Sequence, residues 1–350
     1  CSIALPKYVK YDKDNKPYFD FEHLRQVSEY IIGPMNDVID NNHYPVPETK
    51  TSNMRHRPIG IGVQGLVSVY VKMRLPFESE AAKKLNKEIF ETIYYGTLQG
   101  SIKLAKEKGA YETFTGSPFS QGKLQFDLAA EYDGINLDDY LSGRWDWDTL
   151  KSDLVKYGAR NSMLTALMPT ASTAQIMGNN EAFEAFTSNL YTRRTLSGEF
   201  VIVNKHLVRD LVELDLWSDN LKNKIITEKG SVQNIAEIPV EIREIYKTVW
   251  ELKQREVIDM SADRGKFICQ SQSLNLFIKD ANAAKLTSAH FHSWRKGLKT
   301  GMYYLRTEAA TSAIASLGID LSAVQNSSQK NMEDLSCSLD NPEDCVSCSS

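Results

Sequence analysis

A short apolar run that leads into a proline and a group of hydroxyl residues constrains the fold more than any other segment. Residues 162–168 (Ser-Met-Leu-Thr-Ala-Leu-Met) have the length of a buried strand. Residues 169–173 (Pro-Thr-Ala-Ser-Thr) follow, and a helical pattern then stops at Gly178. Proline suits a first helical turn, and hydroxyls beside the free N–H groups of a helix start can bind an anion. We expect a strand, an anion-binding turn and a helix, with a plain Ser/Thr helix cap as the alternative to anion binding.

The rest of the chain alternates between helical spacing and short apolar runs. Helices that alternate with short apolar strands predict an α/β fold. Apolar residues three and four apart predict helices over 17–43 (ending near Gly33-Pro34), 80–108, 199–217 and 235–262. Strands are expected at 267–277 and 301–305, and residues 109–148 are loop-rich.

Composition argues against several classes of protein. The 350 residues (39.5 kDa) include 41 basic and 45 acidic side chains, so the formal charge is −4 and the pI is about 6.0. That balance argues against a protein that coats nucleic acid or a membrane surface. No apolar run approaches the roughly 18 residues of a membrane-spanning helix, and no secretory signal opens the chain. We expect about two domains or one large one, and a cytoplasmic location.

Acidic charge is concentrated near the C-terminus. From Gly318 to Ser350 there are six acidic residues and one basic residue, so this segment carries −5 and residues 1–317 carry about +1. The segment has no aromatic residue and is rich in Ser, Asn and Gln. It cannot bury enough apolar surface to offset the entropy of ordering. We predict a folded domain over 1–317 and a mobile acidic tail over 318–350.

The five cysteines do not suggest a secreted disulfide framework, because their number is odd and no signal peptide is present. Cys345 and Cys348 form a CxxC pair within the expected tail. A structural zinc site would need further ligands, and the tail contains neither a second pair nor a histidine. The pair is either a redox dithiol or two exposed cysteines of no consequence. The other cysteines are Cys1, Cys269 and Cys337.

Gly60, Gly62 and Gly65 fit the GxGxxG pattern of dinucleotide-binding proteins. That pattern has a physical meaning only where a strand leads into it. The preceding residues 53–58 are polar and end in proline, so no strand is expected there. We therefore expect a turn or a close helix contact and no nucleotide site.

Tyr303 and Tyr304 are adjacent phenols at the start of an expected strand. Neighbouring side chains on a regular strand point to opposite faces. The two rings can therefore meet only at a strand end or where the backbone is irregular. Taken by itself, the pair is typical of core packing.

The six histidines do not form a recognisable metal or catalytic site. His290 and His292 would lie on one face of a strand, but no third ligand has a suitable spacing. No Ser-His-Asp, HExxH or paired-carboxylate pattern is present either. We expect structural histidines and no bound metal.

Five blocks of the sequence resemble the large (catalytic) subunit of class I ribonucleotide reductase, in its eukaryotic and viral form. They follow the family's order, and the ending Cys345-Val-Ser-Cys348 resembles the family's tail dithiol. The implied fold is the C-terminal part of a ten-stranded α/β barrel with surrounding helices and a flexible C-terminal tail. The blocks are residues 55–66 (RHRPIGIGVQGL), 168–176 (MPTASTAQI), 192–200 (TRRTLSGEF), 270–275 (QSQSLN) and 298–306 (LKTGMYYLR).

The resemblance implies roles for three groups of residues. One group would hold the diphosphate of a ribonucleotide, the second would relay a radical from the small subunit, and the third would reduce an active-site disulfide after each turnover. The residues that would hold the diphosphate are Thr170, Ala171, Ser172 and Thr173. The radical relays would be Tyr303 and Tyr304, and the disulfide would be reduced by Cys345 and Cys348.

The resemblance also implies partners. They are a metal-containing small subunit that supplies the radical, thioredoxin or glutaredoxin, the N-terminal part of the large subunit, a second copy of the complete subunit, and a ribonucleoside diphosphate. ATP and deoxynucleotide effectors would bind the upstream part, so no cofactor is expected in this chain. Neither nucleic acid nor a membrane is an expected partner.

Several family residues would lie upstream of this sequence. The radical-bearing cysteine, its asparagine and glutamate neighbours, and the first active-site cysteine precede the segment that corresponds to residues 2–6. Only Cys1 precedes that segment here, closer to Ser2 than the family's second active-site cysteine. We interpret the chain as a C-terminal portion that is inactive alone. It would derive from a truncated, split or intein-interrupted gene, with Cys1 as the splice-junction nucleophile in the intein case.

The activity implied for the complete subunit is reduction of ribonucleoside diphosphates to deoxyribonucleoside diphosphates, for DNA precursor synthesis. A thiyl radical takes the ribose 3′ hydrogen, and two cysteines supply the electrons that replace the 2′ hydroxyl with hydrogen. The alternative is a non-catalytic assembly module that binds reductase subunits. A stand-alone thiol–disulfide exchanger is disfavoured, because no helix start lies beside the tail cysteines to lower a thiol pKa.

Overall fold

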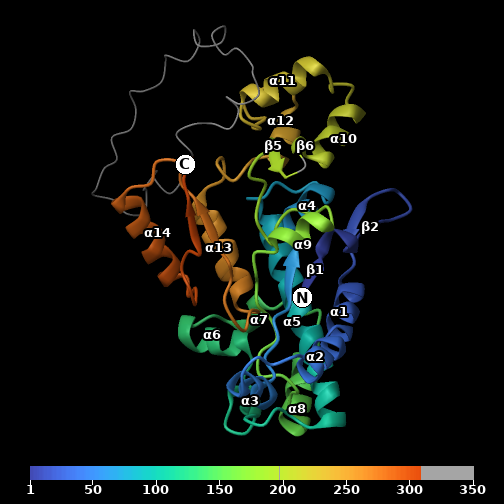
Figure 1. The fold of residues 1–350 in the computed structure, drawn as a ribbon, viewed down its shortest axis with the longest axis vertical. Coiled ribbons are helices and arrows are strands. Elements are labelled where there is room, and N and C mark those ends of the chain that lie inside the picture. Colours follow the sequence, from blue (N-terminus) through green and yellow to red (C-terminus); the bar gives the residue numbers. More distant parts are fainter. Residues whose placement is uncertain (197, 309–350) are drawn as a thin grey trace. The chain divides into compact units, whose positions relative to one another are not determined.

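The computed structural model describes residues 1–196 and 198–308 (Figure 1). Cys345 and Cys348 lie outside these residues, as do the expected tail and its boundary at residue 317. The chain forms two compact units. Unit 1 contains residues 1–184, 258–274 and 292–304, and unit 2 contains residues 185–257, 275–291 and, among the described residues, 305–308.

Unit 1 is built on a ladder of parallel strand segments. β1 (Ser2–Ala4) pairs in parallel with β4 (Gly62–Gln64). Residue 61 forms a parallel bridge to residue 165, and residue 167 forms one to residue 272. Four segments that are distant in the sequence therefore lie side by side, in the order β1, β4, 164–168 and 270–273. Parallel strands need long crossover connections, which are helical here, so the α/β prediction is confirmed.

No strand leads into the GxGxxG motif, as expected, because the helix Pro47–His56 precedes it. The motif itself contributes β4 to this ladder, where only a turn or a close helix contact was expected. Gly62 lies within β4, where a Cβ atom would be 2.6 Å from Met168 Sδ and 2.7 Å from the Ala166 carbonyl oxygen. A residue without a side chain allows this close approach of two strands. Only Gly65, with φ +77°, forms a turn, and α4 (Leu66–Lys72) follows it directly.

Helix α5 (Glu80–Lys108) confirms the long helix predicted over 80–108. Ser79 caps it, because the Ser79 Oγ accepts a hydrogen bond from Ala82 N at 3.2 Å. Helices α1 (Phe21–Tyr30) and α8 (Trp147–Tyr157) both pack against α5 (Figure 1). The middle of α5 is buried, so this helix forms part of the core of unit 1.

The helix predicted over 17–43 is divided in three. β3 (Pro17–Phe19) comes first and pairs with β2 (Val9–Tyr11), and α1 and α2 (Ile32–Asn41) follow. α1 ends at Tyr30, close to the expected end near Gly33-Pro34, but Gly33 and Pro34 themselves lie in the first turn of α2. A proline is tolerated there because the first N–H groups of a helix have no intrahelical partner.

The helix predicted over 199–217 is also partly wrong. β6 (Gly198–Val203) pairs antiparallel with β5 (Leu190–Thr195), and helix α10 (Lys205–Glu213) starts only after it. Phe-Val-Ile-Val at 200–203 favours a strand once a partner strand is available. The helix predicted over 235–262 is likewise two helices, α12 (Val240–Ile245) and α13 (Gln254–Gly265).

The strand regions near the C-terminal end are shorter than expected. β7 (Asn275–Phe277) pairs with β8 (Tyr304–Arg306). Residues 267–270 lie mostly in turns and bends, and residues 271–274 contain a single bridge, at residue 272. The remaining elements complete the described chain: η1 (Leu5–Tyr8), α3 (Pro47–His56), η2 (Pro118–Gln121), α6 (Gln125–Asp133), α7 (Leu137–Tyr140), α9 (Ala171–Ile176), α11 (Asp219–Thr227) and α14 (Ala283–Arg295).

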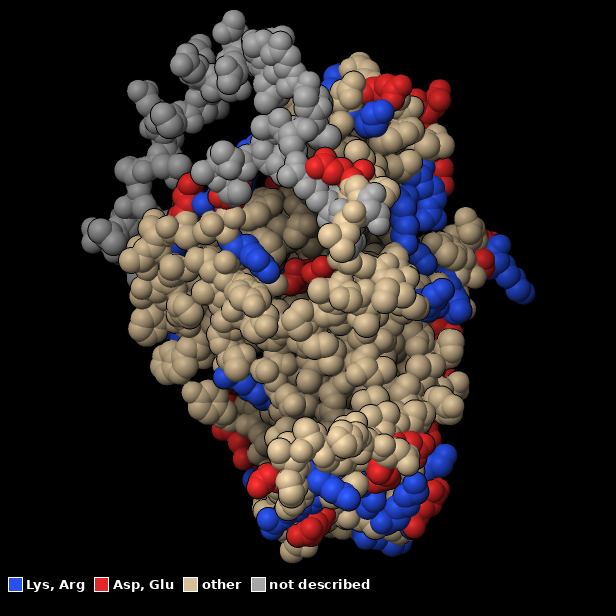
Figure 2. Space-filling view, in the orientation of Figure 1, with Lys and Arg blue, Asp and Glu red and all other residues tan. Residues whose placement is uncertain are grey.

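Charges of both signs are mixed on the surface of unit 1. Figure 2 shows basic and acidic side chains interspersed at the end that carries α3 and α8. Ion pairs such as Lys106–Asp153, at 2.8 Å, are part of this surface. Within the described residues, no helix combines the length and the apolar character needed to cross a membrane.

Candidate functional site

The turn before α9 has the strand–turn–helix form that the sequence predicts. Residues 164–168 are extended within the ladder, and Thr170 adopts a left-handed conformation with φ +57° at the start of α9. The first intrahelical hydrogen bond runs from Ala174 N to the Thr170 carbonyl oxygen, at 2.8 Å. Pro169 therefore lies just outside the helix and not in its first turn.

The hydroxyl residues of this turn divide into two groups. The Thr170 side chain is buried, and its Oγ1 accepts a hydrogen bond from Ala182 N at 2.8 Å. Ala171, Ser172 and Thr173 are exposed, and their N–H groups precede the first intrahelical bond. Thr170 thus fixes the turn, while Ala171, Ser172 and Thr173 leave their N–H groups, and Ser172 and Thr173 their hydroxyls, on the exposed side of the helix start.

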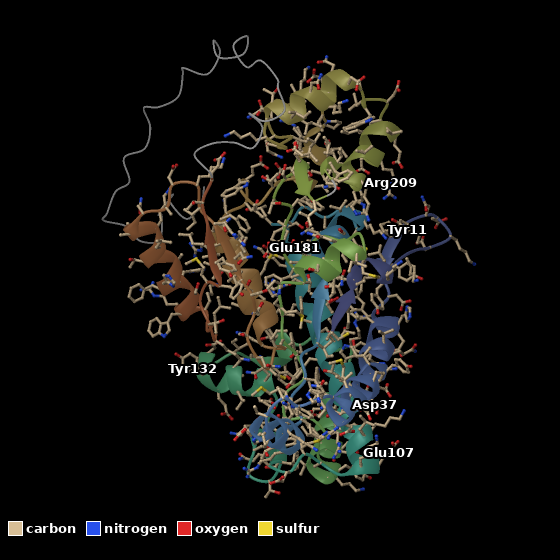
Figure 3. The ribbon with its side chains drawn as sticks, in the orientation of Figure 1. Tyr11, Asp37, Glu107, Tyr132, Glu181 and Arg209 are labelled. Atoms are coloured by element: carbon tan, nitrogen blue, oxygen red, sulfur yellow. The ribbon has the colours of Figure 1, made fainter. Side chains whose placement is uncertain are left out.

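A second loop supports the turn from behind. Ala182 follows Glu181, which lies beside α9 (Figure 3). The carbonyl oxygens of Asn180 and Ala182 accept hydrogen bonds from Gly65 N and Leu66 N, at 2.9 and 3.3 Å. The end of β4, the start of α4 and the turn at Thr170 are thereby joined through one loop.

The tyrosine pair lies at the end of a strand, as contact between the rings requires. Tyr303 precedes β8, and its ring centroid is 4.4 Å from that of Tyr304, with 65° between the ring planes. Both side chains are about half exposed, at 53% and 49%, so the core-packing interpretation is wrong. A hydrogen bond with the Tyr304 hydroxyl raises the pKa of Tyr303, so Tyr303 stays protonated near neutral pH.

The strand ladder brings the turn and the tyrosine pair to the same edge. Residues 167 and 272 form the bridge between the last two segments. Pro169 lies two positions after residue 167, and Leu274 lies two positions after residue 272. Tyr303 N donates to the Leu274 carbonyl oxygen at 2.6 Å. Neighbouring strands are about 5 Å apart, so the Tyr303 backbone and the start of α9 lie beyond the carboxyl ends of adjacent segments. Ligands of parallel α/β folds bind at this edge.

Cys1 lies at the opposite end of the ladder. Cys1 precedes β1 and is exposed. Its carbonyl oxygen accepts a hydrogen bond from Gly62 N at 2.9 Å. The α-amino group donates to the Gly60 carbonyl oxygen at 3.0 Å, and burial lowers the pKa of this amine. Cys1 is therefore placed at the amino end of β1, whereas α9 begins beyond a carboxyl end.

Comparison with known proteins agrees with this geometry. The family model for the ribonucleotide reductase barrel domain matches residues 1–304. The chain belongs to this family. It is 58% identical to the ribonucleoside-diphosphate reductase large chain of Cryptosporidium parvum, over 90% of this chain and 38% of that protein. It is 51% identical to the large subunit of Arabidopsis thaliana, over 100% of this chain and 45% of that protein.

A solved structure shares the fold. The class Id ribonucleotide reductase alpha subunit of Actinobacillus ureae aligns with 88% of this chain and 49% of that chain, with a TM-score of 0.65 and 26% identity. The chain spans about two-fifths of the length of the curated relatives it matches. The ladder of unit 1 is thus part of a ribonucleotide reductase barrel, as the sequence resemblance implied.

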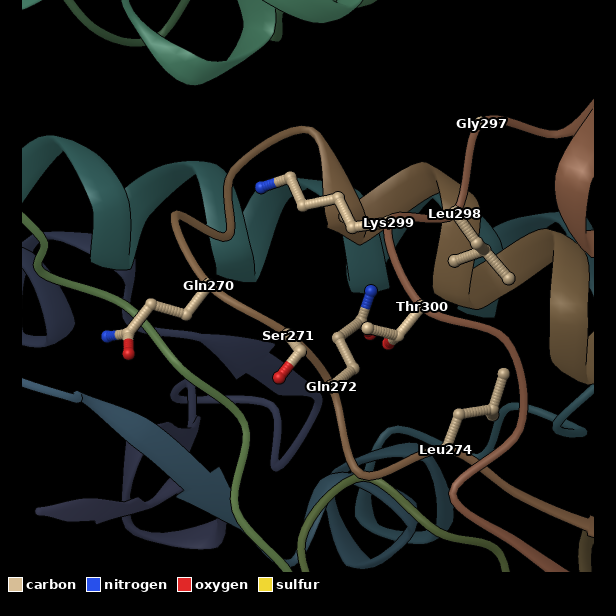
Figure 4. Close-up of a pocket in the computed structure, with 9 residues that line it drawn as sticks. Gln270, Ser271, Gln272, Leu274, Gly297, Leu298, Lys299 and Thr300 are labelled. Atoms are coloured by element: carbon tan, nitrogen blue, oxygen red, sulfur yellow. The ribbon is translucent and has the colours of Figure 1, made fainter.

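Lys299 joins two segments of this barrel and was missed in the sequence. A small cavity of about 20 Å³ lies between residues 270–274 and 297–300 (Figure 4). The Lys299 amine donates to the carbonyl oxygens of Ile268 and Cys269. Burial of this amine end lowers the pKa of Lys299 to about 8. Its position just before the tyrosine pair was the only signal in the sequence.

Arg264 is a second unpredicted member of the barrel. Its guanidinium is fully buried and stacks on the Phe183 ring at 4.0 Å. It donates to uncharged acceptors on Ser261, Gln272 and Asn86, at 2.6, 2.7 and 3.4 Å. Burial lowers its pKa to about 10. Nothing in the local sequence distinguishes this arginine from a surface residue.

The histidine pair is part of helix α14, so the expected strand face is not formed. His292 Nε2 lies 2.8 Å from Asp259 Oδ1, which gives this histidine a structural partner. Among residues 1–196 and 198–308, histidine, cysteine and carboxylate side chains do not gather into a possible metal site.

Proposed function

We propose that this chain forms the diphosphate-binding and radical-transfer part of a ribonucleoside-diphosphate reductase. The observation that supports this most strongly is the meeting of the α9 turn and the Tyr303 backbone beyond the carboxyl ends of adjacent strands. A substrate whose phosphates rest on the turn would place its ribose close to the end of the radical path. The names of the relatives support the same activity.

The α9 turn suits a diphosphate. Ala171, Ser172 and Thr173 present N–H groups at a helix start, and two of the three add hydroxyls. Such groups neutralise an anion without a lysine. The buried bond from Ala182 N to Thr170 holds the turn in its left-handed form before a ligand arrives.

The tyrosine pair suits radical transfer. Tyr303 and Tyr304 are in ring contact, with centroids 4.4 Å apart, which suits the passage of an electron between adjacent phenols. Half of each side chain is exposed, which leaves room for a radical-generating small subunit to dock. Cys345 and Cys348 would then reduce the active-site disulfide, and thioredoxin or glutaredoxin would re-reduce them.

The first test concerns the tyrosine pair. The chain is assembled with an upstream part of the large subunit, the small subunit and a reductant, and reduction of CDP is measured. Tyr303→Phe and Tyr304→Phe should each abolish turnover while CDP binding is retained, because phenylalanine keeps the ring but cannot be oxidised to a phenoxyl radical. Tyr11→Phe, at another half-exposed tyrosine, is the matched control and should keep full activity. Turnover that is indifferent to Tyr303→Phe and Tyr304→Phe would favour the assembly module.

The second test concerns the turn. Ser172→Ala and Thr173→Val should raise the KM for CDP with little change in kcat, because each removes a hydrogen bond made to bound phosphate. A hydrogen bond to a charged group contributes about 1.5–3 kcal/mol, which corresponds to a roughly tenfold to hundredfold change. Thr51→Val on α3 is the control. An unchanged KM in both turn variants would exclude the turn as the phosphate site.

A further inference from the structure

Unit 1 contains a cavity of about 590 Å³ that the proposed function does not use. The end of α6, helix α7, the last turn of α13 and residues 294–296 at the end of α14 line it. Residues 262–266 precede the ladder segment 270–273, so the cavity lies toward the amino end of that segment. The α9 turn lies beyond the carboxyl ends. Small-molecule sites typically have volumes of about 300–1,000 Å³.

Hydrogen bonds and a ring contact hold the walls of the cavity in place. The Tyr140 hydroxyl donates to the Asp263 carbonyl oxygen, which joins α7 to α13. The Tyr140 ring also stacks on Phe267, with 5.8 Å between the ring centroids. The Lys266 amine donates to Asp133 Oδ2 at 3.0 Å, and these two side chains are only 10% and 18% exposed. The cavity is therefore formed before any ligand arrives.

Two aromatic side chains line the cavity and remain open to solvent. Trp294 is 64% exposed, and Tyr132, at the end of α6 (Figure 3), is 73% exposed. Packing within unit 1 thus covers little of either side chain. Exposed aromatic side chains at the edge of a cavity are typical of a surface on which a flat ring stacks.

The charged groups of the cavity leave one cation and one acid for a ligand. Lys266 is already paired, and the Lys296 amine lies 3.2 Å from Asp259 Oδ1. No carboxylate among residues 1–196 and 198–308 pairs with Arg295. Nor does any described residue donate a hydrogen bond to the Asp263 carboxyl, and burial raises the pKa of this group. A guanidinium suits a carboxylate or a phosphate, and a desolvated carboxyl suits an N–H donor.

Other kinds of small ligand fit the cavity poorly. The Asp263 carboxylate already faces three lysine amines, which would repel a cationic ligand. They are those of Lys87, Lys266 and Lys296. An uncharged hydrocarbon ring would use the aromatic surface but would leave Arg295 and Asp263 without partners. The two rings and these two groups together favour a flat ring that carries both an N–H donor and a negative charge.

We propose that this cavity binds a flat heteroaromatic molecule that carries a ring N–H and an anionic group. The ring stacks on Trp294 and Tyr132. Arg295 holds the anionic group, which is a carboxylate or a phosphate, and the N–H donates to the Asp263 carboxyl. The site is separate from the α9 turn and the tyrosine pair, so it goes beyond the proposed reductase function.

Isothermal titration calorimetry of the full chain with indole-3-acetate tests this directly. The ligand has a flat ring, an N–H and a carboxylate, and we expect a dissociation constant of about 1 mM or lower. Indole-3-acetamide lacks the charge and 1-naphthaleneacetate lacks the N–H, so each should bind at least about fivefold more weakly. 3-Indoxyl phosphate carries a phosphate in place of the carboxylate, and the tighter of the two anions identifies the group that the site prefers.

Three substitutions locate the binding site. Trp294→Ala should weaken binding of indole-3-acetate at least about fivefold, because it removes the stacking surface. Arg295→Gln should weaken it by a similar factor and abolish the preference over indole-3-acetamide. Asp263→Ala should abolish the preference over 1-naphthaleneacetate. Trp217→Ala, in unit 2, and Arg55→Gln, at another exposed arginine, are the matched controls and should leave the affinity unchanged.

Absence of binding by both indole-3-acetate and 3-indoxyl phosphate up to roughly 10 mM would overturn the proposal. Binding that Trp294→Ala and Arg295→Gln leave unchanged would also overturn it, because the ligand would then occupy another site. Circular dichroism and a thermal midpoint establish that each variant is folded. No turnover is measured and neither the α9 turn nor the tyrosine pair is changed, so failure here is distinguishable from failure of the proposed function.

Discussion

Arg264→Lys should lower the free energy of unfolding more than Arg264→Met, although lysine keeps the positive charge. The guanidinium holds three uncharged acceptors, on Ser261, Gln272 and Asn86, and stacks on Phe183. Burial lowers its pKa from 12.5 to about 10. At about 1.36 kcal/mol for each pKa unit, the charged form in the native state costs about 3 kcal/mol.

The two substitutions change these contributions differently. Arg264→Met removes the guanidinium donor from three acceptors, two of them on the buried residues Ser261 and Asn86, at about 1–3 kcal/mol each, but it also removes the buried charge. The expected loss in the free energy of unfolding is about 2 kcal/mol. Arg264→Lys keeps the charge, loses the planar fork and reaches one of the three acceptors at most, so the expected loss is about 4 kcal/mol.

Urea unfolding followed by tryptophan fluorescence measures both variants against the parent chain. Arg55→Met is the control, since its ion pair with Glu112 is solvent-exposed and contributes under about 1 kcal/mol. A lysine variant as stable as the parent, or a methionine variant less stable than the lysine variant, would refute the reasoning. Either result would mean that the charge is solvated or paired in a way that the buried geometry does not allow.

Three further outcomes are expected. Gly62→Ala should lower the thermal midpoint and, under the proposed function, weaken CDP binding, because its Cβ would meet the Ala166 carbonyl oxygen at 2.7 Å and displace the strand that leads into the α9 turn. Gly33→Ala is the control, since nothing lies within 4 Å of its Cβ position and its φ is not positive. A change no larger than that of Gly33→Ala would contradict the expectation. Burial raises the pKa of Glu91 above 4.5, so the native state binds more protons than the unfolded state and stability falls as the pH rises above 4.5. Glu91→Gln should therefore flatten this part of the plot of urea midpoint against pH. An unchanged slope in Glu91→Gln would argue against this cause. After reductive methylation with ¹³C-formaldehyde, the methyl resonance of Lys299 should titrate near pH 8. This resonance is identified by its absence in Lys299→Arg. Titration near 10.5 would mean that the Lys299 amine is fully hydrated.

Local sequence was sufficient where the neighbouring residues decide the conformation. The long helix α5 and the turn before α9 could be predicted because spacing, capping and hydroxyl residues act within a few positions of one another. The errors over 17–43 and 199–217 have one cause. β3 and β6 are short strands that exist because β2 and β5 pair with them, and helical spacing alone does not reveal a partner.

The amino-acid sequence by itself determined the family, the hydroxyl-rich turn and the presence of two adjacent phenols. Only the tertiary structure decided which of these meet, because the parallel ladder joins segments about a hundred residues apart through backbone hydrogen bonds that carry no side-chain signature. The same holds for Thr170, whose hydroxyl is turned inward to Ala182, and for Arg264, whose acceptor on Asn86 is 178 positions away. Contacts of this kind depend on how the strands and helices pack, and so no local pattern predicts them.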